Sequence, residues 1–303
     1  MSVQNASAAI GGASKSQKKS RGALFWKSVR KFPMVYVGGL IVFLLVICAV
    51  FAPVLALHNP ITQYQNGLHM DGTPVGPSKF FPFGADDVGR DVYSRLIYGS
   101  RVSLIVGFVA TAISLLIGTT LGLISGYFGG FIDTVIMRIT DTILAFPFLL
   151  FALALVTILG SSLTNVLIAI GILGWGVMAR VVRGQVLSVK EFEYVQAARA
   201  LGASTPRILF RVILPNILGP IIVLATLAVS QNILVEAGLS FLGVGVQPPT
   251  PSWGNMIYAG VQDYQFAPWL MVYPGVALLL AVLGFNLLGD GLRDILDPRN
   301  ATH

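Results

Sequence analysis

The sequence predicts an all-α polytopic membrane protein with six transmembrane helices, on the basis of its composition and the spacing of its apolar runs. Hydrophobic residues make up 55% of the 303 residues and charged residues only 11%. A soluble domain carries about a quarter charged residues, so this chain has too little polar surface to cover a globule in water. Six apolar runs each approach the roughly 17–25 residues that a membrane-crossing helix needs.

The N-terminal region is predicted to be a basic cytoplasmic tail followed by the first transmembrane helix. Residues 1–31 contain seven Lys or Arg residues and no acidic residue. Residues 32–57 form an uncharged run, longer than the roughly 7–15 residues of a signal-peptide core. Residues 58–100 are the longest polar stretch and are predicted to form an extracytoplasmic loop. Within it, residues 89–95 favour a short interfacial helix.

The other five spans are predicted in chain order. The apolar runs cover residues 102–126, 135–159, 166–182, 217–239 and 269–288. Gly118, Gly122 and Gly126 recur at helical spacing in the second span, a pattern that lets two helix backbones approach closely. Residues 101–290 are therefore predicted to form the main membrane domain, and residues 291–303 a cytoplasmic tail.

The distribution of basic residues predicts the orientation. With six spans, only Lys79, Arg90, Arg95 and Arg101 of the 20 Lys and Arg residues lie on the side of the 58–100 loop. Cytoplasmic segments of membrane proteins carry an excess of Lys and Arg. Both termini and residues 183–216 are therefore predicted to lie in the cytoplasm.

The stretch YVQAARALGASTPRILFRVILPN, residues 194–216, is polar although it lies between two apolar runs. Gly202 suits the left-handed position that ends a helix, Thr205 can cap a second helix, and Pro206 suits its first turn. That helix is expected to end before Pro215, at the entry to the fifth span. Connections usually have about 4–6 residues, so this helix–Gly–helix segment is longer than a linker requires. The alternative interpretation is an amphipathic hairpin held on the lipid headgroups by its arginines.

This stretch resembles the EAA loop of ABC importer permeases, in which Glu-Ala-Ala, a glycine and an aliphatic-x-Leu-Pro sequence recur at fixed spacing. Gln196-Ala197-Ala198, Gly202 and Val212-Ile213-Leu214-Pro215 match every fixed point, with Gln196 where the family often has Glu. Four further stretches resemble the dipeptide, oligopeptide and nickel permease subfamily: FGADDVGRDVYSRLIYGSRVSL, GYFGGFIDTVIMRITDTILAFP, EAGLSFLGVGVQPPTPSWGNM and FNLLGDGLRDILDPR. The resemblance extends from about residue 83 to residue 299.

The resemblance implies a type I ABC importer permease fold in the cytoplasmic membrane of a prokaryote. A coupling loop, residues 190–216, then contacts an ATPase subunit. The residues implied in this contact are Glu193, Tyr194, Gln196, Ala197, Ala198, Gly202, Ala203, Leu214 and Pro215. The implied partners are a second permease in a heterodimer, two ATPase subunits that hold ATP and Mg, and an extracytoplasmic solute-binding protein. No nucleic acid and no cofactor within this chain are expected.

Two ionisable residues, Asp141 and Glu236, lie in or near predicted spans. A charge at the bilayer centre costs about 2.5–3.5 kcal/mol on insertion scales, so such side chains usually face protein or water. Both are candidates to line or brace the translocation path. For Asp141 a pair with Arg138, one turn earlier, is favoured instead. For Glu236 the alternative is solvation near the outer end of its span.

The stretch QPPTPSWG, residues 247–254, supplies candidates for contact with the binding protein, namely Pro248, Pro249 and Trp253. An equally good interpretation is a loop stiffened by proline, with Trp253 anchored at the membrane interface.

No catalytic or metal site is predicted. The sequence contains no GxxxxGK[ST] phosphate loop, no HExxH and no GxSxG motif. His58, His69 and His303 lack metal-ligand spacing and are expected to be isolated and exposed.

The predicted function is the permease subunit of an ATP-driven importer, with di- and oligopeptides as expected solutes and glutathione-like compounds and nickel left open. A secondary transporter or channel is the alternative, but the sequence shows few mid-span charges and no inverted repeat.

Overall fold

The structure, a computed structural model, describes residues 33–296, so the predicted tail of residues 1–31 lies outside the described part. Within residues 33–296 the chain is helical and contains no β-strand. The elements are α2 (Pro33–Val50), α3 (Ala52–Leu55), η1 (Gln65–Gly67), α4 (Val92–Phe128), α5 (Gly130–Ala145), α6 (Phe148–Leu159), α7 (Leu163–Leu173), α8 (Trp175–Val189), α9 (Glu193–Ala200), α10 (Thr205–Arg207), η2 (Ile208–Ile213), α11 (Leu214–Phe241), α12 (Trp253–Gly260) and α13 (Trp269–Leu296).

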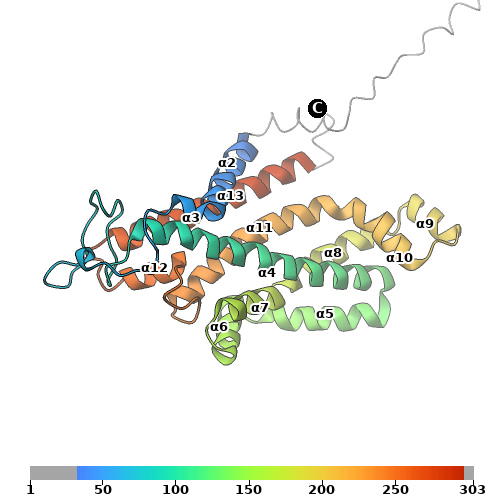
Figure 1. Cartoon of the computed structure of the whole chain (residues 1–303). Coiled ribbons are helices and arrows are strands. Elements are labelled where there is room, and N and C mark those ends of the chain that lie inside the picture. Colours follow the sequence, from blue (N-terminus) through green and yellow to red (C-terminus); the bar gives the residue numbers. More distant parts are fainter. Residues whose placement is uncertain (1–32, 297–303) are drawn as a thin grey trace, which may run out of the picture.

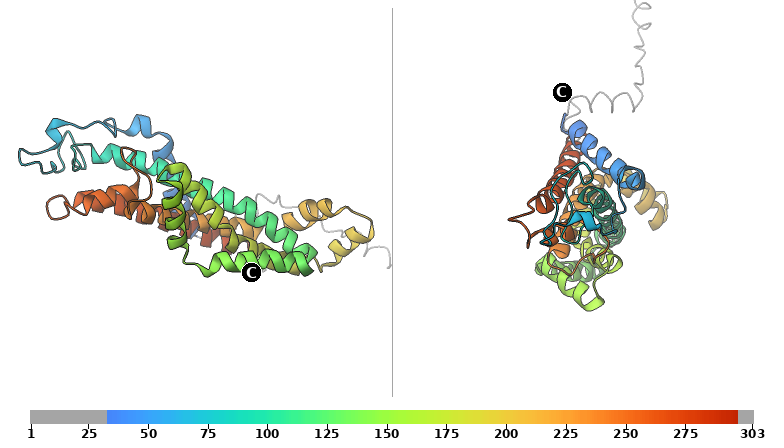
Figure 2. Two further views of the ribbon diagram at one scale, coloured as in Figure 1. Left: turned by 90° about the horizontal axis from the view of Figure 1, so that it is seen from below. Right: turned by 60° about the vertical axis from the view of Figure 1, so that its left-hand side comes forward.

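The described helices satisfy the expectation of a polytopic membrane protein. Five are long and apolar enough to cross a membrane, and six do so if the bent pair α5–α6 counts as one span. The long helices run lengthwise, with α9 and α10 at one end of the molecule and η1 and α12 at the other (Figure 1). The left view of Figure 2 shows the same elongated shape, from which the segment around α9 projects at one end.

Small residues bring α4 and α8 into close contact, as the glycine spacing predicts. A Cβ atom on Gly118 would lie 2.6 Å from Met178 Cβ, and one on Gly122 would lie 2.7 Å from Val182 Cβ. A Cβ on Gly126 would lie 2.7 Å from Val186 Cβ. The three glycines therefore form a continuous contact line along α4 that larger residues would force apart.

The helices that contain the second and sixth predicted spans extend beyond their apolar runs. Helix α4 begins at Val92, where the side chain of Asp91 accepts a hydrogen bond from Ser94 N at 3.1 Å and caps the helix. Residues 92–100 are therefore the first turns of α4 and do not form a separate interfacial helix. No proline interrupts the helix between these first turns and the apolar run that begins at residue 102. Similarly, α13 continues to Leu296, beyond the predicted boundary at residue 290.

The third predicted span is broken, which the prediction of one helix over residues 135–159 missed. Helices α5 and α6 meet at an angle of 90°. The break lies at Phe146, which is extended with φ −87° and ψ 139° and precedes Pro147. A proline disfavours the helical conformation of the residue before it, so the chain turns here. Helix α6 therefore crosses the direction of the long helices instead of extending α5.

Candidate functional site

The segment predicted as helix–Gly–helix has that local structure. Helix α9 ends at Ala200, with Leu201 as its C-cap, and Gly202 adopts a φ of +74°, which glycine tolerates without strain. Gly202 N donates to Arg199 O at 3.0 Å and Ala203 N donates to Ala198 O at 3.1 Å. These two bonds are the Schellman pattern, which satisfies the last carbonyl groups of a helix.

The second half of the segment differs from the prediction at both ends. Ser204, not Thr205, occupies the position before α10, with Pro206 in the first turn. Residues from Thr205 to Phe241 form one helix of 37 residues, so no break separates the loop from the fifth span at Pro215. The helix accommodates Pro215, which lacks a backbone N–H, just after the wider π-helical stretch η2. Leu214 and Pro215 thus lie within this continuous helix.

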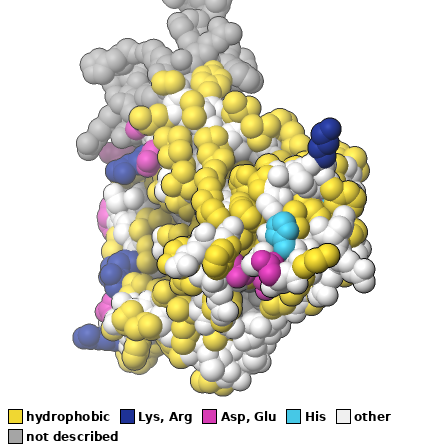
Figure 3. Space-filling model, turned by 90° about the vertical axis from the view of Figure 1, so that its left-hand side faces the viewer, with side chains coloured by type: hydrophobic (Ala, Val, Ile, Leu, Met, Phe, Trp, Pro, Cys, Tyr) yellow, Lys and Arg dark blue, Asp and Glu magenta, His cyan; other side chains and the backbone are white. Residues whose placement is uncertain are grey.

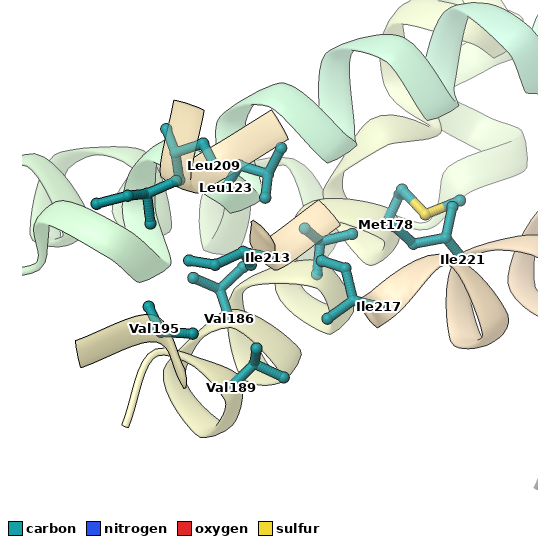
Figure 4. Close-up of a cluster of buried hydrophobic side chains, with 11 residues drawn as sticks. Leu123, Met178, Val186, Val189, Val195, Leu209, Ile213, Ile217 and Ile221 are labelled. Atoms are coloured by element: carbon teal, nitrogen blue, oxygen red, sulfur yellow. The ribbon is translucent and has the colours of Figure 1, made fainter. Parts of the chain in front are cut away.

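One buried side chain fixes α9 to the body of the protein. Val195 is fully buried, whereas Glu193, Tyr194, Gln196 and Ala197 on the same helix are exposed. Figure 4 shows Val195 within a cluster that joins α4, α8, η2 and α11. The cluster consists of Leu123, Met178, Val182, Val186, Val189, Val195, Ile208, Leu209, Ile213, Ile217 and Ile221. Most of the remaining surface of α9 is exposed.

Large exposed apolar side chains that the sequence analysis did not single out lie in the same segment. Leu201 is 87% exposed, and Phe192 and Phe210 are also exposed. Ala198 and Ala203, from the predicted set, are only partly exposed. Exposed apolar groups at a polar loop indicate an interaction surface. The signal in the sequence was the large apolar residue directly before Gly202.

Polar contacts join the loop to α4, and the amide nitrogen of Gln196 forms a hydrogen bond within the loop. Lys190 Nζ donates to Gly126 O at 3.0 Å, and the Arg199 guanidinium lies 5.3 Å from the centre of the Tyr127 ring. Gln196 Nε2 donates to Glu191 O at 3.1 Å. Gln196 therefore stabilises the loop that leads into α9 through its amide nitrogen, a bond that a glutamate could not donate.

Asp141 pairs with a residue other than the predicted Arg138. Its Oδ1 accepts from Arg180 Nη2 at 2.8 Å, and both side chains are 54% exposed. A second ion pair, which the sequence analysis missed, is less exposed: Arg183 Nη2 donates to Asp133 Oδ2 at 2.6 Å while Arg183 Nε donates to Asp133 Oδ1. Both pairs join α5 to α8, whose residues are about 40–50 positions apart, so local spacing could not reveal them.

Glu236 is fully buried, so the prediction of solvation near a span end is wrong. Ser240 Oγ donates to Glu236 Oε1 at 2.8 Å and Ser103 Oγ donates to Oε2 at 3.2 Å. The loop after α11 folds back over this site, because Val246 N donates to Ser240 Oγ at 3.1 Å. Glu236 therefore braces the junction of α4, α11 and the following loop.

Trp253 is also buried, which excludes the predicted contact with a binding protein and the predicted anchoring in the interface. It is 1% exposed, and its Nε1 donates to Leu96 O at 3.1 Å. It begins α12, which the sequence analysis did not predict. Pro248 and Pro249 remain exposed, joined by a cis peptide bond.

The end of the molecule that carries α12 presents acidic groups to solvent. Figure 3 shows this end, with acidic side chains near the middle of the face beside a histidine. A cavity of about 430 Å³ there is lined by Asp87, Pro248, Tyr258 and Asp263, among others. Burial, together with the neighbouring charge of Asp86, raises the pKa of Asp87 above its ordinary value of 3.8. Arg90 also lines this cavity, and its Nη2 lies 3.6 Å from Asp87 Oδ1, so acidic and basic groups are paired at this end.

A larger cavity of about 670 Å³ lies between the bent pair α5–α6 and the helices α7, α8, α11 and α13. Its lining is apolar apart from Ser230, Gln231, Asn232 and Asn286. Small-molecule sites usually have volumes of about 300–1,000 Å³. Asp141 and Arg180 are not among its lining residues, although each lies one helical turn from one of them, Leu144 and Val177 respectively.

No group of three or more potential metal ligands occurs among the residues that the structure describes. The expectation of isolated, exposed histidines is wrong for His58. Its Nδ1 lies 3.2 Å from Asp91 Oδ2, and its ring lies 4.5 Å from that of Phe80, centre to centre. His303 lies outside the described residues.

Comparison with known proteins identifies the family. Residues 118–302 match the family described as "Binding-protein-dependent transport system inner membrane component". Residues 20–71 match "N-terminal TM domain of oligopeptide transport permease C". Residues 72–117, which include part of the polar loop, lie between these two matches.

Curated relatives are similar over nearly their whole lengths. The chain is 47% identical over 279 residues to the dipeptide transport system permease protein DppC of Alkalihalophilus pseudofirmus, covering 90% of this chain and 88% of the relative. It is 42% identical over 298 residues to the oligopeptide transport system permease protein OppC of Bacillus subtilis, covering 97% and 95%. It is 42% identical over 275 residues to the glutathione transport system permease protein GsiD of Pectobacterium atrosepticum, covering 91% and 90%.

These matches confirm the resemblance seen in the sequence and the predicted class of fold. The family is one of transport permease subunits of ABC importers, which implies ATPase and binding-protein partners. The chain therefore belongs to the binding-protein-dependent inner-membrane permeases, as a multi-pass permease component, of type I fold, of a bacterial ABC importer.

Proposed function

We propose that this permease imports short peptides and that α9 is its contact with an ATPase subunit. The observation that carries the second point is the geometry of the coupling loop. An eight-residue helix, Glu193–Ala200, is fixed by one buried side chain and ends at a glycine in the left-handed region. Its exposed surface and the exposed Leu201 supply the polar and apolar groups that a protein interface requires.

The proposed assembly has two permeases, this chain and a sister chain, with two ATPase subunits that hold ATP and Mg. The excess of basic residues on the side of α9 supports a cytoplasmic position for the coupling loop and for both termini. The acidic α12 end then faces the other side, where Pro248 and Pro249 are exposed for contact with a solute-binding protein.

In the proposed mechanism, ATP-driven closure of the ATPases displaces α9. Because α9 packs through Val195 on η2 and α8, the displacement reaches the helix that runs from Thr205 to Phe241. That helix lines the 670 Å³ cavity with Leu224, Gln231 and Leu234. Solute access then alternates between two arrangements, each favoured by a different ligand state of the ATPases.

Peptides are the proposed solutes because two of the relatives are dipeptide and oligopeptide permeases by name and the third carries the peptide-like glutathione. The test is uptake by cells that contain the complete transporter, with a labelled dipeptide, a pentapeptide, glutathione and Ni²⁺ as probes. We expect dipeptide or pentapeptide uptake that stops on ATP depletion, and an ATPase subunit that purifies with the chain.

Uptake that persists without ATP, from a chain that purifies alone, would instead identify an uncoupled transporter. Uptake of Ni²⁺ alone would disprove the proposed solute class while leaving the ATP coupling intact.

A further inference from the structure

The 670 Å³ cavity contains polar groups that the fold itself does not use. Three consecutive residues of α11, Ser230, Gln231 and Asn232, all contribute to its lining. Ser230 and Asn232 form hydrogen bonds to neighbouring helices. Gln231 forms no such bond, and this difference points to a ligand.

Ser230 and Asn232 join α11 to its neighbours. Ser230 Oγ lies 2.7 Å from Asn286 Oδ1 of α13 and 2.8 Å from Leu227 O. Asn232 Nδ2 donates to Thr111 Oγ1 of α4 at 2.9 Å. Both residues are almost completely buried. Such bonds between helices are the ordinary use of polar side chains within a membrane protein.

Gln231 lies between them and is exposed. Within residues 33–296 its amide forms no hydrogen bond, although it can offer two donors and one acceptor group. Asn286 likewise has no partner for its Nδ2 in that part of the chain, since only its Oδ1 accepts from Ser230. A polar group facing hydrocarbon without a partner is costly, so these amides are suited to a polar ligand or water.

The remaining lining narrows the chemistry of that ligand. Among the described residues that line the cavity, none is ionisable, and Phe146, Phe148 and Phe151 at the bend between α5 and α6 supply aromatic surface. A metal cation would lack the carboxylate, imidazole or thiolate ligands that it prefers. A peptide group matches better, because a side-chain amide can accept from its N–H and donate to its C=O at once.

We infer that the amide of Gln231, together with Nδ2 of Asn286 in the lining of the same cavity, binds the main chain of a peptide during its passage, while the phenylalanines contact its side chains. Recognition through the peptide group is independent of side-chain identity, which suits a permease whose relatives carry dipeptides, oligopeptides or glutathione. This inference rests on the proposed import of peptides and specifies which atoms of the solute the permease contacts.

The test compares a dipeptide with its ester analogue, for example Ala-Ala with alanyl-lactate, in cells that carry the complete transporter. The ester replaces the peptide N–H by oxygen and so cannot donate to Gln231 Oε1. The measured quantity is the ratio of the two uptake efficiencies, kcat/KM, in the wild type and in Gln231→Met. Because the binding protein is the same in both, a change in this ratio reports the permease alone.

We expect the preference for the dipeptide to fall about fivefold in Gln231→Met, the effect of losing one hydrogen bond. Thr226→Val is the matched control, because it removes a polar group of α11 that bonds only to Ile222 O and does not line the cavity. This control should keep the wild-type ratio. Gln231→Asn, which retains a shorter amide, should give an intermediate ratio and answers the question even if Gln231→Met fails to insert.

An unchanged ratio in Gln231→Met at normal membrane abundance overturns the inference while peptide import stands. Where Gln231→Met fails to insert, an unchanged ratio in Gln231→Asn overturns it. A wild type that takes up no peptide overturns the proposed function itself, and the inference with it. The two failures are therefore distinguishable from the wild-type measurement.

Discussion

At one end of the molecule α9 stops at Gly202, and at the other end α11 stops at Gly243, with φ angles of +74° and +80°. Both glycines follow the same hydrogen-bond pattern, since Val244 N donates to Leu239 O at 3.1 Å as Ala203 N donates to Ala198 O. The segments after the two turns differ. Beyond Gly243 the chain returns onto buried Ser240, whereas Gly202 lies at an exposed tip.

The same local motif therefore serves two purposes. At the α12 end it lets the chain cover Glu236 with buried hydrogen bonds, which makes that end a fixed platform. At the α9 end it shapes a protrusion that depends on one buried valine and a few polar contacts. Elements that move in a coupled transporter are expected to have few buried contacts, and α9 fits this description.

The largest expected effect comes from strain at the two glycines. A β-branched residue at a φ near +75° costs about 1–3 kcal/mol of local strain. We expect Gly202→Val to reduce ATP-driven uptake at least tenfold, because the strain distorts α9 where it meets the ATPase. Gly243→Val imposes the same strain in equally open space and should leave most uptake intact. Equal losses at equal membrane abundance would show that α9 has no special role.

A smaller effect, on stability, is expected at the α12 end, where Glu236 is buried. Glu236→Ala leaves the hydroxyls of Ser103 and Ser240 without their buried acceptor. Each unsatisfied group costs about 1–3 kcal/mol, so the melting temperature of the purified protein should fall. Glu236→Gln keeps one acceptor and should lose less. A melting temperature unchanged in Glu236→Ala would mean that the loop does not depend on this carboxyl group.

The two ion pairs between α5 and α8 provide a further contrast. A double-mutant cycle on Asp133 and Arg183 should give a coupling energy above about 1 kcal/mol, because the contact is bidentate and partly shielded. The same cycle on Asp141 and Arg180, both 54% exposed, should give about 0.2–1 kcal/mol. Chemical unfolding in detergent measures both. The reverse order would contradict the expectation that the more exposed pair has the weaker coupling.

The smallest expected effect is a dependence on pH at the α12 end. Burial raises the pKa of Asp87, so its stabilising contribution is complete below its ordinary pKa of 3.8 and is lost as the pH rises through the raised value. Asp87→Asn should therefore raise the melting temperature slightly at pH 7 and have no effect at pH 3. Asp71→Asn is the control with opposite sign, because hydrogen bonds from Thr73 lower the pKa of Asp71. Melting-temperature shifts in the same direction for both variants would contradict the opposite pKa directions given for Asp87 and Asp71.

The sequence predicted the parts of the molecule that local rules decide. Gly202 lies where a helix must end in the left-handed region, and the glycines of α4 lie where another helix approaches. The 90° bend could have been predicted from Pro147, because a proline restricts the residue before it. The partners of Asp141 and Glu236 could not, since Arg180 and Ser103 are brought to them only by tertiary packing. The free amide of Gln231 is likewise visible only after the bonds of its neighbours are known.

The unbroken helix from Thr205 to Phe241 has a mechanical consequence. At 1.5 Å per residue its 37 residues span about 55 Å, so it acts as a lever arm with one end in the coupling loop and the other at the platform. A rigid rotation of about 5° about its midpoint would displace each end by roughly 2.4 Å in opposite directions. The same small angle would sweep Gln231, nearer the far end, across the cavity by about 1 Å, which is enough to make or break a hydrogen bond.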